Sequence, residues 1–232
     1  MAVGTLQASM SLLFRQRCFY LFMALLLLIV AVPFVFGVQG GRAALQVAHA
    51  LVLVAALAAV GRGTTVFLVG LLLAIPALAL QLTAFVRDDP TISVMIAAGL
   101  YVAFYLLTIA SLLRYVFNPE VMTADKLFGA AAAYLLIGIL WADLYRLIQY
   151  VDPEAFGGGA GKPLRSYYDL IYMSFGCLTS NGPGDILPVG SRVRSLVILE
   201  QLVGTLFVAI LIARLAGIYP AKEAAQDLTS SQ

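Results

Sequence analysis

Long apolar runs joined by very short polar links dominate the chain. A membrane-spanning helix needs about 20 mostly apolar residues, and six stretches meet that requirement. They lie at residues 18–38, 44–61, 64–86, 91–113, 127–151 and 194–218. Pro33 and Pro76 fall inside these stretches, where transmembrane helices tolerate them. The pattern predicts an all-α membrane protein with six transmembrane helices.

The segment between the last two apolar stretches has a different pattern. Residues 151–165, "VDPEAFGGGAGKPLR", form a glycine-rich polar stretch, and residues 166–180, "SYYDLIYMSFGCLTS", are moderately apolar but too short to span. The glycine-punctuated loop "NGPGD" follows. Irregular backbone at membrane depth is tolerated only where protein buries it or water meets it. A half-length helix followed by such a loop therefore predicts a re-entrant segment.

Composition supports the membrane class and narrows the chemistry. The chain is 62% hydrophobic and 11% charged, against an apolar share of about 45–50% in soluble domains. The net charge of +2 is too small to indicate a nucleic-acid partner. Cys18 and Cys177 are isolated, which predicts neither a disulfide scaffold nor a metal knuckle. We interpret His49, in an apolar run, as a buried core residue, because a metal site needs several convergent ligands.

The charges that flank the apolar stretches predict orientation and exclude one kind of gating. Arg15 and Arg17 precede the first stretch, which is too long for the apolar core of a signal peptide and is interpreted as an uncleaved span. A slight excess of basic residues favours cytoplasmic termini in a multi-pass protein of the cell membrane. The fourth stretch carries only Arg114, so it lacks the regularly spaced arginines of a voltage sensor.

Residues 168–217 carry a resemblance to a known family. Their sequence is "YDLIYMSFGCLTSNGPGDILPVGSRVRSLVILEQLVGTLFVAILIARLAG". It resembles the pore module of the potassium-channel-like tetrameric cation channels, especially the bacterial pore-loop type. That family has a pore helix, the filter T-T-V-G-Y-G-D, a proline, an arginine and an inner helix with a hinge glycine. Here Thr179 and Ser180 stand at the threonines, Asn181 at the valine, Gly182 at the first glycine, Pro183 at the tyrosine, Gly184 and Asp185 at the last two filter positions, and Gly204 at the hinge.

The resemblance implies a homotetramer in a lipid bilayer that conducts cations passively. Rings of backbone carbonyls from four chains would replace the water around K⁺ or Na⁺, and glycine readily adopts the backbone angles that such rings need. Monovalent cations would bind at these carbonyls, and no organic cofactor is implied. Ser180 would add an inner hydroxyl ring, and Asp185 would attract cations at the outer mouth. The implied domains are a four-helix transmembrane domain (1–122), a pore domain (123–220) and a short polar tail (221–232).

Departures from the family pattern lead to an expectation about selectivity. Pro183 has neither a hydroxyl nor a backbone N–H, and the pore-helix pair that would brace the filter reads Tyr172-Met173. Asn181 needs hydrogen-bond partners or water, and we expect Tyr172 to reach Asp185. A shorter, wider or more hydrated filter should discriminate weakly between K⁺ and Na⁺. A K⁺-selective channel and a non-conducting membrane subunit with a degenerate filter remain the alternatives.

Charged groups inside the spans are costly and therefore call for an explanation. Asp143 and Arg146 lie three residues apart, on one helix face. They are interpreted as an ion pair that tethers the fifth helix to the pore module, with a gating role as the alternative. Glu200 is expected to contact either the back of the pore helix, at Ser174 or Thr179, or Arg146.

Two further interpretations concern the inner helix and catalysis. Gly204 is either a hinge or a small residue that permits close helix packing. Ser180 has no evident base beside it, and His49 is distant in sequence, so we predict that the chain is not an enzyme. A transporter usually has paired broken helices in two related halves, and none is evident. A regulatory partner is not identifiable from the sequence.

Overall fold

The computed structural model describes residues 17–35, 41–60, 64–86, 91–119, 121–157, 165–182 and 184–218. Within these ranges the chain is almost entirely helical. The helices are α2 (Arg17–Val35), α3 (Gly41–Val60), α4 (Thr64–Val86), α5 (Thr91–Val116), α6 (Ala124–Val151), α7 (Tyr167–Leu178) and α8 (Ser191–Ile218). Each of the six predicted apolar stretches is thus a helix, and α7 occupies most of the predicted half-length segment.

Four of the described helices are long and apolar enough to cross a membrane, judged by length and composition. Their spans are Thr65–Thr83, Ile92–Val116, Ala124–Val151 and Ser191–Gly217. Two described helices contribute shorter apolar stretches, Arg17–Val30 and Gln46–Ala59. The prediction that the chain is a membrane protein is therefore confirmed, whereas the count of six spans stays a prediction.

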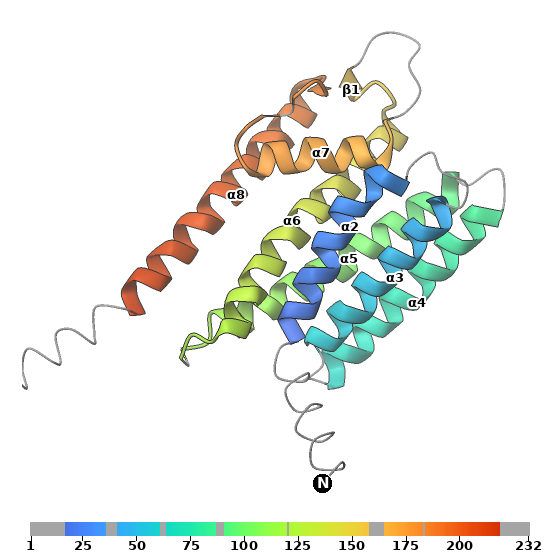
Figure 1. Ribbon diagram of the computed structural model, residues 1–232. Coiled ribbons are helices and arrows are strands. Elements are labelled where there is room, and N and C mark those ends of the chain that lie inside the picture. Colours follow the sequence, from blue (N-terminus) through green and yellow to red (C-terminus); the bar gives the residue numbers. More distant parts are fainter. Residues whose placement is uncertain are drawn as a thin grey trace, which may run out of the picture.

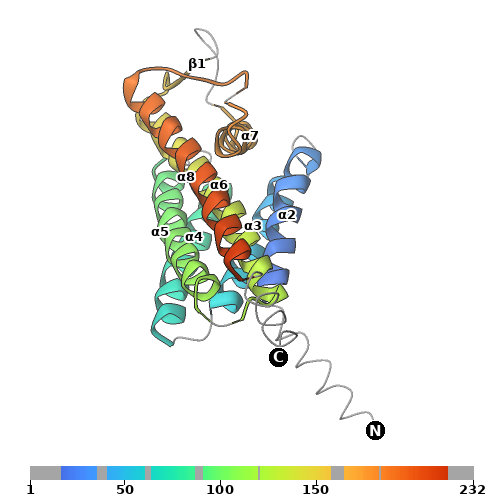
Figure 2. The ribbon, with the colours of Figure 1, turned by 90° about the vertical axis from the view of Figure 1, so that its left-hand side faces the viewer.

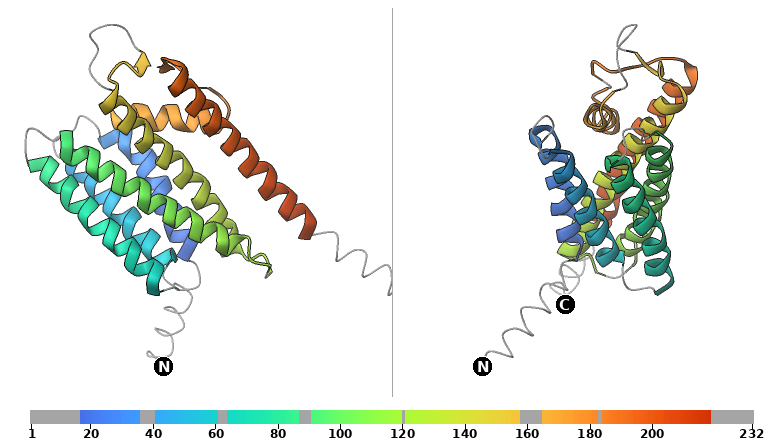
Figure 3. Two further views of the ribbon diagram at one scale, coloured as in Figure 1. Left: turned by 180° about the vertical axis from the view of Figure 1, so that it is seen from behind. Right: turned by 90° about the vertical axis from the view of Figure 1, so that its right-hand side faces the viewer.

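Helices α2 to α6 lie side by side in a bundle, and α7 lies across one end of it (Figure 1). Helix α5 packs against α4 and α6, and α2 packs against α3 and α6. Seen end-on in Figure 2, α7 lies between α8 and α2. Helix α8 contacts α7 and α6 near one end and then extends beside the bundle, as Figure 3 shows from behind.

Local sequence signals explain where the helices of the C-terminal half begin. Helix α6 starts three residues before its predicted boundary because Thr123 is its N-cap and accepts a hydrogen bond from the Lys126 N–H. Helix α8 starts directly after Gly190, which has a φ of +84°. Proline within a membrane helix is again tolerated, since α4 runs through Pro76.

The polar stretch after α6 contributes a small antiparallel ribbon, the one departure from an all-helical description in the described chain. Strand β1 (Phe156–Gly157) pairs with β2 (Leu187–Pro188). The Phe156 ring packs edge-on against Tyr145 of α6, with centroids 5.4 Å apart. The ribbon thereby joins the segment after α6 to the segment that follows the glycine loop. The predicted polar tail, residues 221–232, lies outside the described residues.

Candidate functional site

Helix α7 has a well-defined N-terminus that is attached to α6. Ser166 Oγ accepts a hydrogen bond from the Asp169 N–H at 3.2 Å, and the Asp169 carboxylate accepts one from the Ser166 N–H at 3.1 Å. This capping box satisfies two of the N–H groups that a helix start leaves open. Gln149 of α6 bonds both the N–H and the carbonyl of Arg165, at 3.1 and 3.0 Å. The first turn of α7 is therefore held at the C-terminal part of α6.

The C-terminus of α7 turns the chain back toward the helix. The Asn181 N–H bonds the Gly176 carbonyl at 2.9 Å, and the Ser180 N–H bonds the Cys177 carbonyl at 2.9 Å. This pair of bonds is a Schellman motif, whose turning residue adopts a positive φ and is usually glycine. Here the turning residue is Ser180, with a φ of +61°. A serine in this position holds a conformation that non-glycine residues seldom adopt.

Glycines in and beside the loop are required by close approach and by backbone angle. A Cβ at Gly176 would lie 2.4 Å from the Gly182 carbonyl oxygen. Gly182 and Gly184 have φ values of +94° and +65°, in the region where side chains are disfavoured. The Gly182 carbonyl thus lies against the helix. Gly176 was not singled out from the sequence, although a glycine inside a helix costs about 1 kcal/mol and usually has a packing or functional reason.

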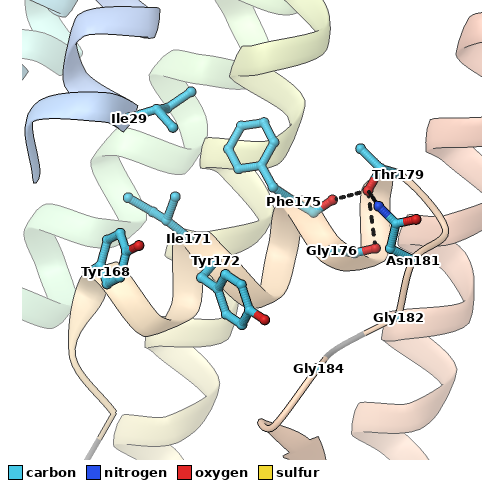
Figure 4. Close-up of a pocket in the computed structure, with 10 residues that line it drawn as sticks. All are labelled: Ile29, Tyr168, Ile171, Tyr172, Phe175, Gly176, Thr179, Asn181, Gly182 and Gly184. Atoms are coloured by element: carbon cyan, nitrogen blue, oxygen red, sulfur yellow. Dashed lines mark hydrogen bonds between the residues drawn. The ribbon is translucent and has the colours of Figure 1, made fainter. Parts of the chain in front are cut away.

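A pocket of about 470 Å³ lies between α2, α7 and the glycine loop (Figure 4). Ile29 and Phe175 contribute apolar wall, and Thr179 and Asn181 contribute polar groups at the loop. Asn181 Nδ2 donates to Thr179 Oγ1 at 3.0 Å, and Thr179 Oγ1 donates to the Phe175 carbonyl at 2.7 Å. The side chain of Asn181 therefore has a partner and remains exposed.

The remaining predicted filter residues are placed as follows. Ser180 Oγ lies 3.0 Å from Thr205 Oγ1 of α8. Asp185 is exposed, and Pro183 lies outside the described residues. Met173, from the predicted bracing pair, is fully buried, whereas Tyr172 is half exposed.

The expected contact between Tyr172 and Asp185 is not formed. Among the described residues no hydrogen bond joins the two side chains, and the Tyr172 hydroxyl lies beside Gly184. A Cβ added at Gly184 would lie 2.9 Å from that hydroxyl oxygen. The expectation is corrected on this point. Tyr172 packs against the loop backbone rather than holding the acidic side chain.

A fully buried polar cluster joins α6, α7 and α8 behind the loop. Glu200 Oε1 lies 2.5 Å from Ser174 Oγ, and Glu200 Oε2 lies 2.5 Å from the Tyr145 hydroxyl. Ser174 Oγ also lies 2.7 Å from the Gly138 carbonyl. Of the contacts that the sequence left open for Glu200, the structure has the one with Ser174. Tyr145 was missed, because no sequence signal relates two residues 55 positions apart.

The charged pair on α6 lies next to the first turn of α7. Arg146 and Asp143 are 3.8 Å apart, with Asp143 buried. The Tyr167 hydroxyl donates to the second oxygen of Asp143 at 3.3 Å, and the Arg146 guanidinium lies 5.3 Å from the centre of the Tyr167 ring. The buried His49 ring is 5.5 Å from Tyr167. Tyr167, also missed from the sequence, thus connects the pair to α7 and to α3.

Gly204 is a point of close approach between α8 and α7. A Cβ at this position would lie 2.0 Å from the Leu178 carbonyl oxygen. The same carbonyl accepts a hydrogen bond from the Tyr134 hydroxyl at 3.2 Å. Helix α8 is continuous through Gly204. The described conformation therefore shows the packing contact that was one of the two interpretations of this glycine.

Residues 130–219 match a family model described as "Ion channel". The match begins within α6, ends just after α8, and includes the loop and the buried cluster. This segment is similar to the pore domain of potassium-channel-like ion channels. The chain is accordingly a membrane protein with an ion channel domain. Neither the comparison with curated proteins nor the comparison with solved structures gives a match.

Proposed function

We propose that the chain is the subunit of a homotetrameric channel that conducts monovalent cations passively. The observation that carries the proposal is the position of the glycine loop inside the ion channel domain. A half-length helix, α7, leads into residues with positive φ at Ser180, Gly182 and Gly184, within the matched residues 130–219. Such a backbone can present carbonyl oxygens to an ion.

The proposed topology has six spans with cytoplasmic termini in the cell membrane. Helices α2 to α5 form a domain beside the pore, α6 and α8 are the outer and inner helices, and α7 with its loop is re-entrant. Backbone that is not helical needs protein or water around it at membrane depth. The hydrogen bonds from the Asn181 and Gly182 N–H groups to Gly176, at 2.9 and 3.0 Å, support this placement of the loop.

Assembly from four copies is supported by the surface of α8. Only 17% of its apolar stretch is buried within the chain, although its mean hydropathy is 2.4. Exposed apolar residues along it include Ile198, Leu202, Leu206 and Ile210. One chain supplies one loop, whereas a cage of carbonyls is built from four. Neighbouring copies and lipid would cover the faces of α8 that the chain leaves open.

Weak discrimination between K⁺ and Na⁺ is the proposed selectivity. The Gly182 carbonyl lies so close to Gly176 that a Cβ there would meet it at 2.4 Å, so this oxygen is directed at α7 rather than away from it. A filter with fewer carbonyl rings retains more water around the ion and separates the two cations less well. The exposed Asp185 would raise the cation concentration at the mouth.

The test is the reversal potential of the purified protein in bilayers with a K⁺/Na⁺ gradient. We expect a cation current that reverses well away from the Nernst potential of K⁺. Reversal near that potential would establish the K⁺-selective alternative instead. Tetramers that carry no current would establish the non-conducting subunit. Asp185→Asn is the matched variant, because it removes the exposed charge and should lower the current without changing assembly.

A further inference from the structure

The buried cluster behind the loop has an unusual distribution of hydrogen-bonding atoms. Ser174 Oγ lies 2.7 Å from the Gly138 carbonyl and 2.5 Å from Glu200 Oε1, and the Tyr145 hydroxyl lies 2.5 Å from Glu200 Oε2. Ser174 and Glu200 are both 0% exposed. These contacts join all three helices of the ion channel domain, so the positions of their protons determine how the helices are held.

Counting protons shows that a carboxylate does not fit this geometry. A serine hydroxyl has one proton, and a backbone carbonyl and an ionised carboxylate have none. If Glu200 were ionised, the single proton of Ser174 would have to serve both the Gly138 carbonyl and Glu200 Oε1. One of the two short contacts would then join acceptor oxygens with no proton between them, which is repulsive.

The surroundings of Glu200 also lack a compensating charge. Within the described part of the chain its hydrogen-bond partners are two hydroxyl groups, and no lysine or arginine forms an ion pair with it. A buried charge is tolerated when it is paired and is strongly unfavourable when it is not. The neutral acid avoids this cost and supplies the proton that the cluster lacks.

We propose that Glu200 carries a proton in the native protein and acts, as a neutral hydrogen-bond donor, as the positioning residue for α7. Its Oε1–H donates to Ser174 Oγ, and Ser174 then donates its own proton to the Gly138 carbonyl. The Tyr145 hydroxyl donates to Glu200 Oε2. Each proton has one acceptor, and each short contact has one proton.

The position of Ser174 in α7 connects this cluster to the loop. Two residues later, the Gly176 carbonyl accepts the N–H groups of Asn181 and Gly182. Fixing Ser174 against α6 and α8 therefore fixes the end of α7 from which the loop turns. Loss of the proton would leave Ser174 unable to satisfy both of its neighbours. Among the described residues, Tyr145 of α6 and Ser174 of α7 form hydrogen bonds with Glu200. Tyr134 of α6 and Cys177 of α7 lie close enough to interact with it electrostatically.

Infrared spectroscopy of the purified full-length protein in lipid tests the protonation state directly. We expect the carbonyl stretch of a protonated carboxylic acid in the wild type, and its loss in Glu200→Gln. Carboxylate bands that disappear in this variant would overturn the proposal. Asp143→Asn is the matched control, because Asp143 is the buried carboxyl group of α6 with a basic partner.

A second variant covers the case in which Glu200→Gln does not fold. Tyr145→Phe removes the hydrogen bond to Glu200 Oε2, the carbonyl oxygen of the proposed acid. The carbonyl stretch should then move to higher frequency, because a carbonyl without a hydrogen bond is stiffer. An unchanged spectrum would contradict the assignment. Both spectra are independent of current, so a protein that shows the acid band but does not conduct refutes the proposed function alone.

Comparing Glu200→Gln with Glu200→Ala distinguishes a role of Glu200 in hydrogen bonding from a role in packing alone. Glutamine can donate to Ser174 with its NH₂ group and accept from Tyr145 with its oxygen, so Glu200→Gln should keep a wild-type-like current. Glu200→Ala leaves both hydroxyl groups without this partner and should lower the ratio of folded to unfolded protein by about tenfold or more. Equal damage from both substitutions would count against the proposal. The current readout rests on the proposed function, whereas the folding ratio does not.

Discussion

Helices α6 and α8 have equal length and very different surroundings. Each has 28 residues. Within the chain, 67% of the apolar stretch of α6 is buried, whereas only 17% of the apolar stretch of α8 is buried. Helix α8 nevertheless has the higher mean hydropathy, 2.4 against 1.8 for α6. The more apolar helix is therefore the less buried one. Apolar character reports how much surface must avoid water, whereas the fold decides whether the chain itself, another copy or lipid covers it.

Gly204, where α8 contacts α7, should be the position most sensitive to substitution in this comparison. In Gly204→Val the side chain would meet the Leu178 carbonyl, since even a Cβ would lie 2.0 Å from it. Backbone cannot yield as a side chain can, so we expect a loss of about 4 kcal/mol or more in unfolding free energy. Denaturant titration in mild detergent measures it. Gly217→Val is the control on the same helix, because Gly217 has no such neighbour within 4 Å; similar losses for both would refute the contact.

A matched pair of leucines separates the two helices directly. Leu136 of α6 is 0% exposed and Leu206 of α8 is 56% exposed. Leu136→Ala should lower the unfolding free energy of the subunit by about 2–5 kcal/mol, because it leaves a cavity. Leu206→Ala should change subunit unfolding little and instead weaken association of copies, measured by size-exclusion chromatography with light scattering. A large unfolding effect at Leu206 would mean that the chain itself covers this face.

A substitution in the buried polar cluster should lower the unfolding free energy by a smaller amount. Ser174→Ala leaves the Gly138 carbonyl and Glu200 Oε1 without this partner, and we expect a loss of about 1–3 kcal/mol in unfolding free energy. Ser195→Ala is the control, since Ser195 is exposed and bonds only one turn back along its own helix, to the Ser191 carbonyl at 3.0 Å. That substitution should stay within about 0.5 kcal/mol. Equal effects would remove the distinction between the buried polar cluster and the exposed face of α8.

The smallest effect on stability should come from the loop. Asp185→Asn alters an exposed side chain, so unfolding free energy should change by less than about 0.5 kcal/mol. Single-channel conductance should fall, and the difference from the wild type should shrink as salt rises, because mobile ions screen an exposed charge. Conductance that does not depend on this substitution at low salt would place Asp185 away from the ion path.

Local sequence signals were sufficient to predict the long helices and the ion pair between Asp143 and Arg146. Apolar runs of membrane length predicted the six long helices, and Ser166 with Asp169 has the spacing of a capping box that starts α7. The pair Asp143 and Arg146 was predictable from helix periodicity. Tyr167, their shared neighbour, was not, because it follows an irregular polar stretch whose path the pattern leaves open.

The sequence by itself determined the membrane class, the helix positions and the presence of a glycine loop, because these depend on hydropathy and on backbone preferences over a few residues. Only the tertiary structure decided that Glu200 meets Ser174 and Tyr145, that Gly176 and Gly204 are points of backbone approach, and that Tyr172 faces Gly184. The contacts of Glu200 and Gly204 join residues from different helices, and those of Gly176 and Tyr172 join α7 to the loop that follows it. Their geometry depends on how closely these segments pack, which hydropathy and local backbone preference do not determine.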